Sequence, residues 1–134
     1  MSKLISFFEI PASDFNRAVK FYETIFGIKM PVAECETEKM AFFVEEGKAQ
    51  SVGAISYAEG FKPSEHGVLI HFNCENIELM TTAITRNGGK IIIPKTKIEA
   101  EGRGWFAVFA DSEGNRIGLY AGKKVFSIFA TSSF

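Results

Sequence analysis

The sequence repeats itself at an offset of 62 residues, and this repeat constrains the fold more than any other feature. Each copy contains an amphipathic helical pattern that a glycine ends. The related positions are Phe15 and Ile77, Ala18 and Met80, Tyr22 and Ile84, and Gly27 and Gly89. Solenoid repeats are shorter and more numerous. The pattern therefore predicts a duplicated half-domain, and chance similarity between two amphipathic helices is the alternative.

Strand-like runs accompany each helical pattern in the same order. One helix is expected to begin near Ser13 and the other near Glu75. The β-prone runs are 3–10, 28–33, 39–45 and 50–57 in the first half and 67–73, 90–94, 104–110 and 116–121 in the second. We therefore predict an α+β fold of two tandem βαβββ modules, about 3–57 and 68–120. The polar segment 58–66 would join them.

Length and charge exclude several classes of protein. A chain of 134 residues suits one domain, which we place at 1–122, and leaves no room for separate cofactor and substrate domains. The tail 123–134 has no counterpart in the first half and would be an added strand or an interface arm. The 15 basic and 16 acidic residues give a net charge of -1, which disfavours nucleic acid as a partner.

Cysteine and apolar content bear on location and packing. Only two cysteines, no signal peptide pattern and no apolar run of membrane-spanning length predict a cytoplasmic protein without a membrane partner. The 14 Phe residues indicate either an aromatic-lined cavity or a large subunit interface, and composition does not choose between these.

Two segments resemble those of a known family. The first is Phe8-Glu-Ile-Pro-Ala-Ser-Asp-Phe-Asn-Arg-Ala18, and the second runs from Trp105 to Tyr120 through the turn Asp-Ser-Glu-Gly-Asn115. With the 62-residue repeat they resemble the glyoxalase, bleomycin-resistance and extradiol dioxygenase superfamily, also called vicinal oxygen chelate, over about residues 3–122. The first segment is similar to the branch described as related to lactoylglutathione lyase. The resemblance implies sheets that curl around a cavity, and a homodimer.

The resemblance also implies where a metal would be held. Metal-dependent members take four His or Glu ligands from the first and last strands of each module, and the matching positions here are Phe7, about Ile55, Leu69 and Gly118. None of these side chains offers a donor to a divalent ion. We therefore expect no metal and no other cofactor. Glyoxalase I chemistry, which uses a metal to stabilise an enediolate, is then not expected.

Glu9 and His71 form the candidate catalytic pair. Alternation along a strand puts Glu9 on the face of Phe7 and His71 on the face of Leu69, and the 62-residue offset relates the two. A carboxylate and an imidazole that meet in a partly apolar cavity can transfer a proton, directly or through a water. The alternative is a buried structural histidine with Glu9 as its partner.

Further residues are expected to contact the ligand. Aliphatic and aromatic side chains would line the cavity, two tyrosines would point inward, and Arg103 with Trp105 would meet an anionic ligand at the entrance. The expected ligand-binding residues are Phe7, Ile55, Tyr57, Leu69, Arg103, Trp105 and Tyr120. Ordinary sheet packing is the alternative for the tyrosines, and a surface position is the alternative for Arg103.

Three classes of function remain open for a protein that binds a small organic molecule. The first is a metal-independent lyase or isomerase that uses Glu9 and His71. The second is a non-catalytic binding protein of the antibiotic-resistance type, and the third is a metal-dependent lyase or dioxygenase with ligands at other positions. Turnover that depends on pH would favour the first class, and stoichiometric binding without turnover would favour the second. Metal in the purified protein would favour the third.

Overall fold

The computed structural model describes residues 4–45, 47–48, 50–99 and 102–122. The predicted tail 123–134 lies outside the described residues. The elements in chain order are β1 (Phe8–Pro11), α1 (Phe15–Phe26), β2 (Val32–Glu34), β3 (Glu38–Val44), β4 (Ser51–Ala58), β5 (His71–Asn73), α2 (Ile77–Arg86), β6 (Lys90–Lys97), β7 (Trp105–Ala110) and β8 (Arg116–Ala121). This order confirms the predicted α+β fold of two βαβββ modules.

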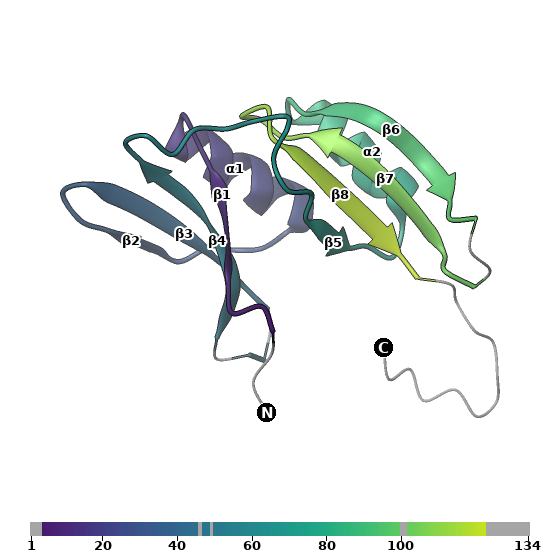
Figure 1. Ribbon diagram of the computed structural model, residues 1–134, viewed down its shortest axis with the longest axis horizontal. Helices are drawn as coiled ribbons and strands as arrows, with labels where there is room; N and C mark the ends of the chain where they lie inside the picture. Colours follow the sequence, from purple (N-terminus) through teal and green to yellow (C-terminus); the bar gives the residue numbers. More distant parts are fainter. Residues whose placement is uncertain (1–3, 46, 49, 100–101, 123–134) are drawn as a thin grey trace.

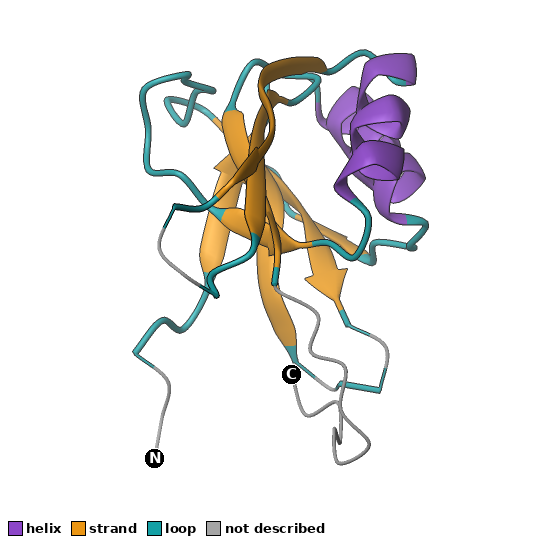
Figure 2. Cartoon of the chain, turned by 90° about the vertical axis from the view of Figure 1, so that its right-hand side faces the viewer, coloured by secondary structure: helices purple, strands orange, loops and turns teal. Residues whose placement is uncertain are grey.

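The two modules have the same sheet topology. The strand orders are β1-β4-β3-β2 and β5-β8-β7-β6, and the first strand of each module pairs in parallel with the last. The sheets lie side by side, with the edge strands β1 and β5 toward the middle of the molecule (Figure 1). Both helices gather on one side of the strands (Figure 2). Each sheet therefore has one face that packs on a helix and one that does not.

Local side-chain chemistry sets the ends of the helices. Asp14, one residue later than expected, caps α1 by accepting a hydrogen bond from the Arg17 amide at 3.1 Å. Gly27 ends α1 with a φ of 64°, a left-handed conformation that glycine adopts at little cost. Asn76 caps α2 in the same way through the Leu79 amide. Neither helix among the described residues is long and apolar enough to cross a membrane.

Phenylalanine joins the two modules. The Phe72 ring of β5 lies 4.8 Å from Phe26, 5.2 Å from Phe43 and 5.9 Å from Phe8, measured between ring centroids. Tyr22 of α1 completes this cluster and is fully buried. Such aromatic contacts add about 0.5 to 1.5 kcal/mol per pair beyond the area they bury. Many of the phenylalanines thus pack between the modules.

Candidate functional site

Strand register places Glu9 and His71 on the sheet faces that carry no helix. Glu9 pairs with Ala54, whereas its neighbour Ile10 lies in the core on the helix side. His71 pairs with Gly118 in the equivalent arrangement of the second module. Because paired residues point to the same side of a sheet, Glu9 and His71 occupy corresponding places in the two modules.

Glu9 lies in a cleft between the modules. The Ser56 hydroxyl donates a hydrogen bond of 2.6 Å to Glu9 Oε1, which fixes the direction of the carboxylate. The cleft has a volume of ≈ 240 Å³, and residues of β1, β8 and the connecting segment line it. Lys62 and Arg116 bring positive charge to the same cavity, and Phe61 supplies an aromatic wall. The cleft is therefore mixed in charge and partly apolar.

The turn between β7 and β8 holds this cleft together. Asn115 Nδ2 donates to the Pro11 carbonyl at 2.8 Å, and the Ser64 amide donates to Asn115 Oδ1 at 3.0 Å. One buried side chain thus joins β1, β8 and the segment that covers the cleft. Asp111 orients this amide by accepting from Asn115 Nδ2 at 3.1 Å and from the Tyr22 hydroxyl at 2.6 Å.

Burial raises the pKa of both members of the Tyr22–Asp111 pair. Burial raises the pKa of Asp111, and the hydrogen bonds from Tyr22 and Asn115 oppose that rise only in part. Burial and the neighbouring Asp111 charge raise the pKa of Tyr22 well above its usual value. Tyr22 therefore stays protonated at neutral pH and acts as a fixed donor. This pair is buried in the core, where Asp111 holds the Asn115 side chain that lines the cleft.

His71 lies apart from the cleft that holds Glu9. Its ring rests on the backbone of Gly118, so a Cβ at residue 118 would overlap Nδ1 of the imidazole. The side chain is exposed, and it forms no ion pair with Glu9. Glu9 and His71 therefore form no direct ion pair among the described residues, and the expected approach through a water stays a prediction. Both side chains lie on the faces without helices.

Ile55 is not a cavity residue. It pairs with Ile10 and Ala41 on the helix side of the first sheet and is 0% exposed, so the prediction that it faces a ligand is wrong. The residue that corresponds to Gly118 by register is Ala54, which pairs with Glu9 as Gly118 pairs with His71. The family resemblance had placed this position at about Ile55, one residue later than the register does.

With Ala54 in place of Ile55, the four corresponding positions still offer no ligand to a metal ion. Phe7 and Leu69 are partly exposed and lie just before β1 and β5, and Phe7 packs near Phe42 with centroids 6.3 Å apart. Like these two, Ala54 and Gly118 lack a nitrogen, oxygen or thiolate donor in the side chain. Among the described residues no group of three or more His, Cys, Asp or Glu side chains could hold a metal ion. These residues do not fit a metal site.

The two tyrosines lie on different sides of their sheets. Tyr57 is two residues after Ile55 on β4 and so shares its side, which means that it does not point toward Glu9. Tyr120 is two residues after Gly118 on the face without a helix, and its hydroxyl donates to the Arg103 carbonyl at 2.6 Å. The inward orientation expected for both phenols therefore fails for Tyr57.

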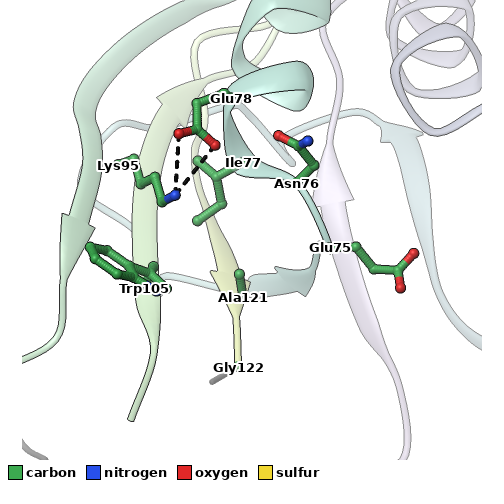
Figure 3. Close-up of a pocket in the computed structure, with 8 residues that line it drawn as sticks. All are labelled: Glu75, Asn76, Ile77, Glu78, Lys95, Trp105, Ala121 and Gly122. Atoms are coloured by element: carbon green, nitrogen blue, oxygen red, sulfur yellow. Dashed lines mark hydrogen bonds and ion pairs between the residues drawn. The ribbon is translucent and has the colours of Figure 1, made fainter. Parts of the chain in front are cut away.

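Trp105 belongs to a second pocket. It pairs with Ala121, a core residue, so its side chain lies on the helix side of the second sheet, opposite to Tyr120. There it lines a pocket of ≈ 450 Å³ beside the start of α2 (Figure 3). The Arg103 side chain is exposed, and Arg103 lines neither this pocket nor the Glu9 cleft. The predicted pairing of Arg103 and Trp105 at one entrance is not observed.

Sequence reasoning missed the residues that surround Glu9. Ser56, Lys62 and Arg116 come from three separate segments. Pairing of β1 with β4 brings Ser56 beside Glu9, and Asn115 joins β1 to the segment that carries Lys62 and to the start of β8. The Asp111–Asn115 turn was the available signal. By itself it looks like an ordinary hairpin turn, and its partners lie 51 and 104 residues away in the chain.

Comparisons with known proteins agree with this architecture. The family model described as Glyoxalase/Bleomycin resistance protein/Dioxygenase superfamily matches residues 4–119. A glyoxylase-like domain-containing protein from Didymella fabae is 33% identical over 115 residues, which cover 83% of this chain and 88% of that protein.

Several solved structures share the fold. A glyoxylase/bleomycin resistance protein/dioxygenase domain from Frankia sp. EAN1pec has a TM-score of 0.71 at 16% identity and covers 92% of this chain and 100% of its own. The fosfomycin resistance protein FosX from Listeria monocytogenes has a TM-score of 0.68 at 22% identity, with 92% and 94% covered. The family model spans most of the chain, and the Didymella fabae protein exceeds 30% identity. The chain therefore belongs to the glyoxalase/bleomycin resistance protein/dioxygenase superfamily.

Proposed function

We propose that this protein binds a small organic molecule with an anionic group in the cleft at Glu9. The observation that carries the proposal is the presence of Lys62 and Arg116 in the cavity that also holds the Glu9 carboxylate. The two cations would bind a carboxylate or phosphate, and Glu9 would accept a hydrogen bond from a hydroxyl or amine of the same molecule. Phe61 and Val68 would cover its apolar part.

The size of the cleft supports a small ligand. Pockets for drug-sized molecules have volumes of about 300 to 1,000 Å³, whereas this cleft has ≈ 240 Å³. A metabolite with a few carbon atoms fits that volume better than a large antibiotic. A short 2-hydroxy carboxylate combines the required anion and hydroxyl and is a suitable probe.

Proton transfer by Glu9 and His71 is a second candidate function. It is supported by their corresponding places on the two faces without helices, and by the fixed direction of the Glu9 carboxylate. In a metal-independent lyase or isomerase, one group would take a proton from the substrate and the other would return it. Since the two side chains form no ion pair here, this role requires a ligand, a water or a second copy between them.

The experiment is a titration with lactate, followed by NMR of isotopically labelled protein. Propionate, which lacks the hydroxyl, is the matched ligand control. We expect Arg116→Gln to weaken lactate and propionate alike, and Glu9→Gln to weaken lactate alone. Arg86→Gln, an exposed change at the end of α2, should affect neither. If lactate moves no NMR signals around the cleft, or if Arg116→Gln does not weaken its binding, the proposed binding site is contradicted.

Catalysis has its own measurement. If Glu9 and His71 transfer protons, Glu9→Gln and His71→Ala abolish a turnover that depends on pH and leave the melting temperature unchanged. If Glu9 has only a structural role, Glu9→Gln instead lowers the free energy of unfolding, on the order of 1 to 3 kcal/mol. Metal analysis of the purified protein tests the metal-dependent alternative. A stoichiometric ion would show that donors outside the four corresponding positions are used.

We also propose a homodimer in the cytoplasm. Exposed apolar side chains precede the first strand of each module, namely Leu4 and Ile5 before β1, and Val68 before β5. Such a patch is costly in water and favours contact with a second copy. The cytoplasmic location rests on the cysteine content and on two free thiols, Cys35 and Cys74.

A further inference from the structure

The pocket at Trp105 is separate from the Glu9 cleft and has a different character. In the part of the chain that the structure describes, no residue lines both cavities. The pocket lies on the helix side of the second sheet, where Ile77 is buried beneath it and Trp105 is 37% exposed at its edge (Figure 3). An exposed indole beside an apolar floor is a surface that favours an apolar occupant.

The charge at the edge of this pocket is negative. Lys95 Nζ pairs with Glu78 at 3.2 Å and lies 4.7 Å from the centroid of the Trp105 ring. Glu75 lines the pocket as well and has no ion-pair partner among the described residues. Two carboxylates and one ammonium leave an excess of one negative charge, so a basic occupant is favoured over an acidic one.

The chain itself supplies a segment with the matching chemistry. The last described residue, Gly122, lines the pocket, and twelve residues follow it in the sequence. These begin with Lys123 and Lys124 and continue with Val125-Phe-Ser-Ile-Phe129. Two cations therefore follow Gly122 directly in the sequence, and an apolar run follows the cations.

We propose that residues 123–129 of the same chain dock in this pocket. The lysines meet the Glu75 side, and the apolar run covers Trp105 and Ile77. An extended chain rises about 3.3 Å per residue, so Phe126 reaches about 13 Å from Gly122, enough to fold back across the pocket. A short tether also gives the segment an effective concentration of about 1 mM or more, which favours it over a second copy at micromolar concentration.

The single tryptophan of the chain makes the test specific. Trp105 is the only source of indole fluorescence and of an indole N–H signal in NMR. The test variant of the full chain is Phe126→Ser with Phe129→Ser, and the control is Phe134→Ser, which lies beyond the docking residues. We expect the double variant to red-shift the emission, to increase acrylamide quenching and to move the indole N–H signal. The control should change none of the three.

A charge exchange tests the same contact without removing apolar groups. Lys123→Glu with Lys124→Glu should expose Trp105, and adding Glu75→Lys should restore part of the protection. Both effects should weaken as salt increases. Unchanged quenching in the Phe126/Phe129 variant would overturn the proposal. Protection of Trp105 that increases with protein concentration would also overturn it, because the occupant would then be a second copy.

Discussion

At the scale of single residues, the place of the His71 ring depends on Gly118. The imidazole lies where a side chain at residue 118 would begin. The corresponding position in the first module, Ala54, has a methyl group and pairs with Glu9. The two modules thus differ at equivalent positions. Gly118 leaves space for the His71 ring on β8, whereas the methyl group of Ala54 occupies that space on β4.

Gly118→Ala should displace the His71 ring. Because His71 is exposed, its ring can rotate away, and we expect the free energy of unfolding to fall by less than about 1 kcal/mol. The imidazole signals in NMR should move. In the background of His71→Ala the same change at 118 should cost less, which a double-mutant cycle measures. Equal costs in both backgrounds would show that the two residues do not contact each other.

Tyr22→Phe removes a donor from a buried carboxylate. We expect a loss of about 1.5 to 3 kcal/mol at pH 7, as for other hydrogen bonds to charged groups. The pKa of Asp111, already raised by burial, should rise further. A raised pKa means that the folded state binds this proton more tightly, so the Asp111 contribution to stability falls as pH rises above the ordinary aspartate range.

The cost of Tyr22→Phe should therefore be larger at pH 7 than in acid, where Asp111 is protonated. Urea unfolding at several pH values measures this difference. Tyr57→Phe is the matched control, since Tyr57 is exposed and should show no cost at either pH. A cost for Tyr22→Phe that does not depend on pH would contradict the role given to Asp111.

The wrong prediction at Ile55 shows that the alternation of side chains along a strand does not by itself say which residues face the helix. Gly53, Ala54, Ile55 and Ser56 are all buried in β4, which lies between β1 and β3 in its sheet. Such a strand shows no alternation between polar and apolar residues, so its sequence does not say which residues point to the helix. In the second module, Gly118 pairs with His71 on the face without a helix.

At the scale of elements, the helices were the most predictable part of the chain. Their apolar periodicity appears in the sequence, and α1 and α2 begin within two residues of the expected positions. Gly27 ends α1 as expected, whereas α2 ends at Arg86 with Asn87 as its cap, before the expected Gly89. The first strand of each module was expected to be longer than it is: β1 spans four residues and β5 spans three. Apolar residues before each strand extended the predicted runs, although they form no ladder.

The start of α1 depends on a turn from the other module. Glu113 Oε1 accepts from the Ser13 and Asp14 amides at 2.9 and 2.8 Å, and Oε2 accepts from Arg17 Nε at 2.7 Å. Burial raises the pKa of Glu113, but its hydrogen bonds, above all those from Arg17, outweigh burial and leave the pKa below its usual value. A helix N-terminus favours such a negative charge.

Glu113→Gln should destabilise the protein at neutral pH, on the order of 1 to 3 kcal/mol. A lowered pKa means that the stabilising charge is complete above the ordinary glutamate pKa of about 4.3 and is lost as pH falls through the folded value. The variant should therefore lose less stability than the wild type on acidification. Melting temperatures at pH 7 and pH 3 measure both effects. Glu78→Gln, which breaks an exposed pair, should have a much smaller effect at pH 7.

At the scale of the whole molecule, we expect a dimer at micromolar concentration. Ile5→Ser and Val68→Ser should each shift sedimentation toward the monomer, because they remove apolar area next to the edge strands β1 and β5. Leu79→Ser, an equally exposed change on α2, should leave the dimer intact. A wild-type protein that sediments as a monomer would contradict the proposed assembly.

The hydrogen bonds between Glu113 and the start of α1 also bear on how the chain folds during synthesis. The Ser13 amide and the carboxylate it bonds are 100 residues apart in the chain. At about 5 to 20 residues per second, a ribosome needs about 5 to 20 s to reach Glu113 after adding Ser13. During that time the Ser13 and Asp14 amides, which precede α1, lack the carboxylate that accepts from them in the folded protein. The contacts that hold the start of α1 therefore form only after the carboxy-terminal half has been made.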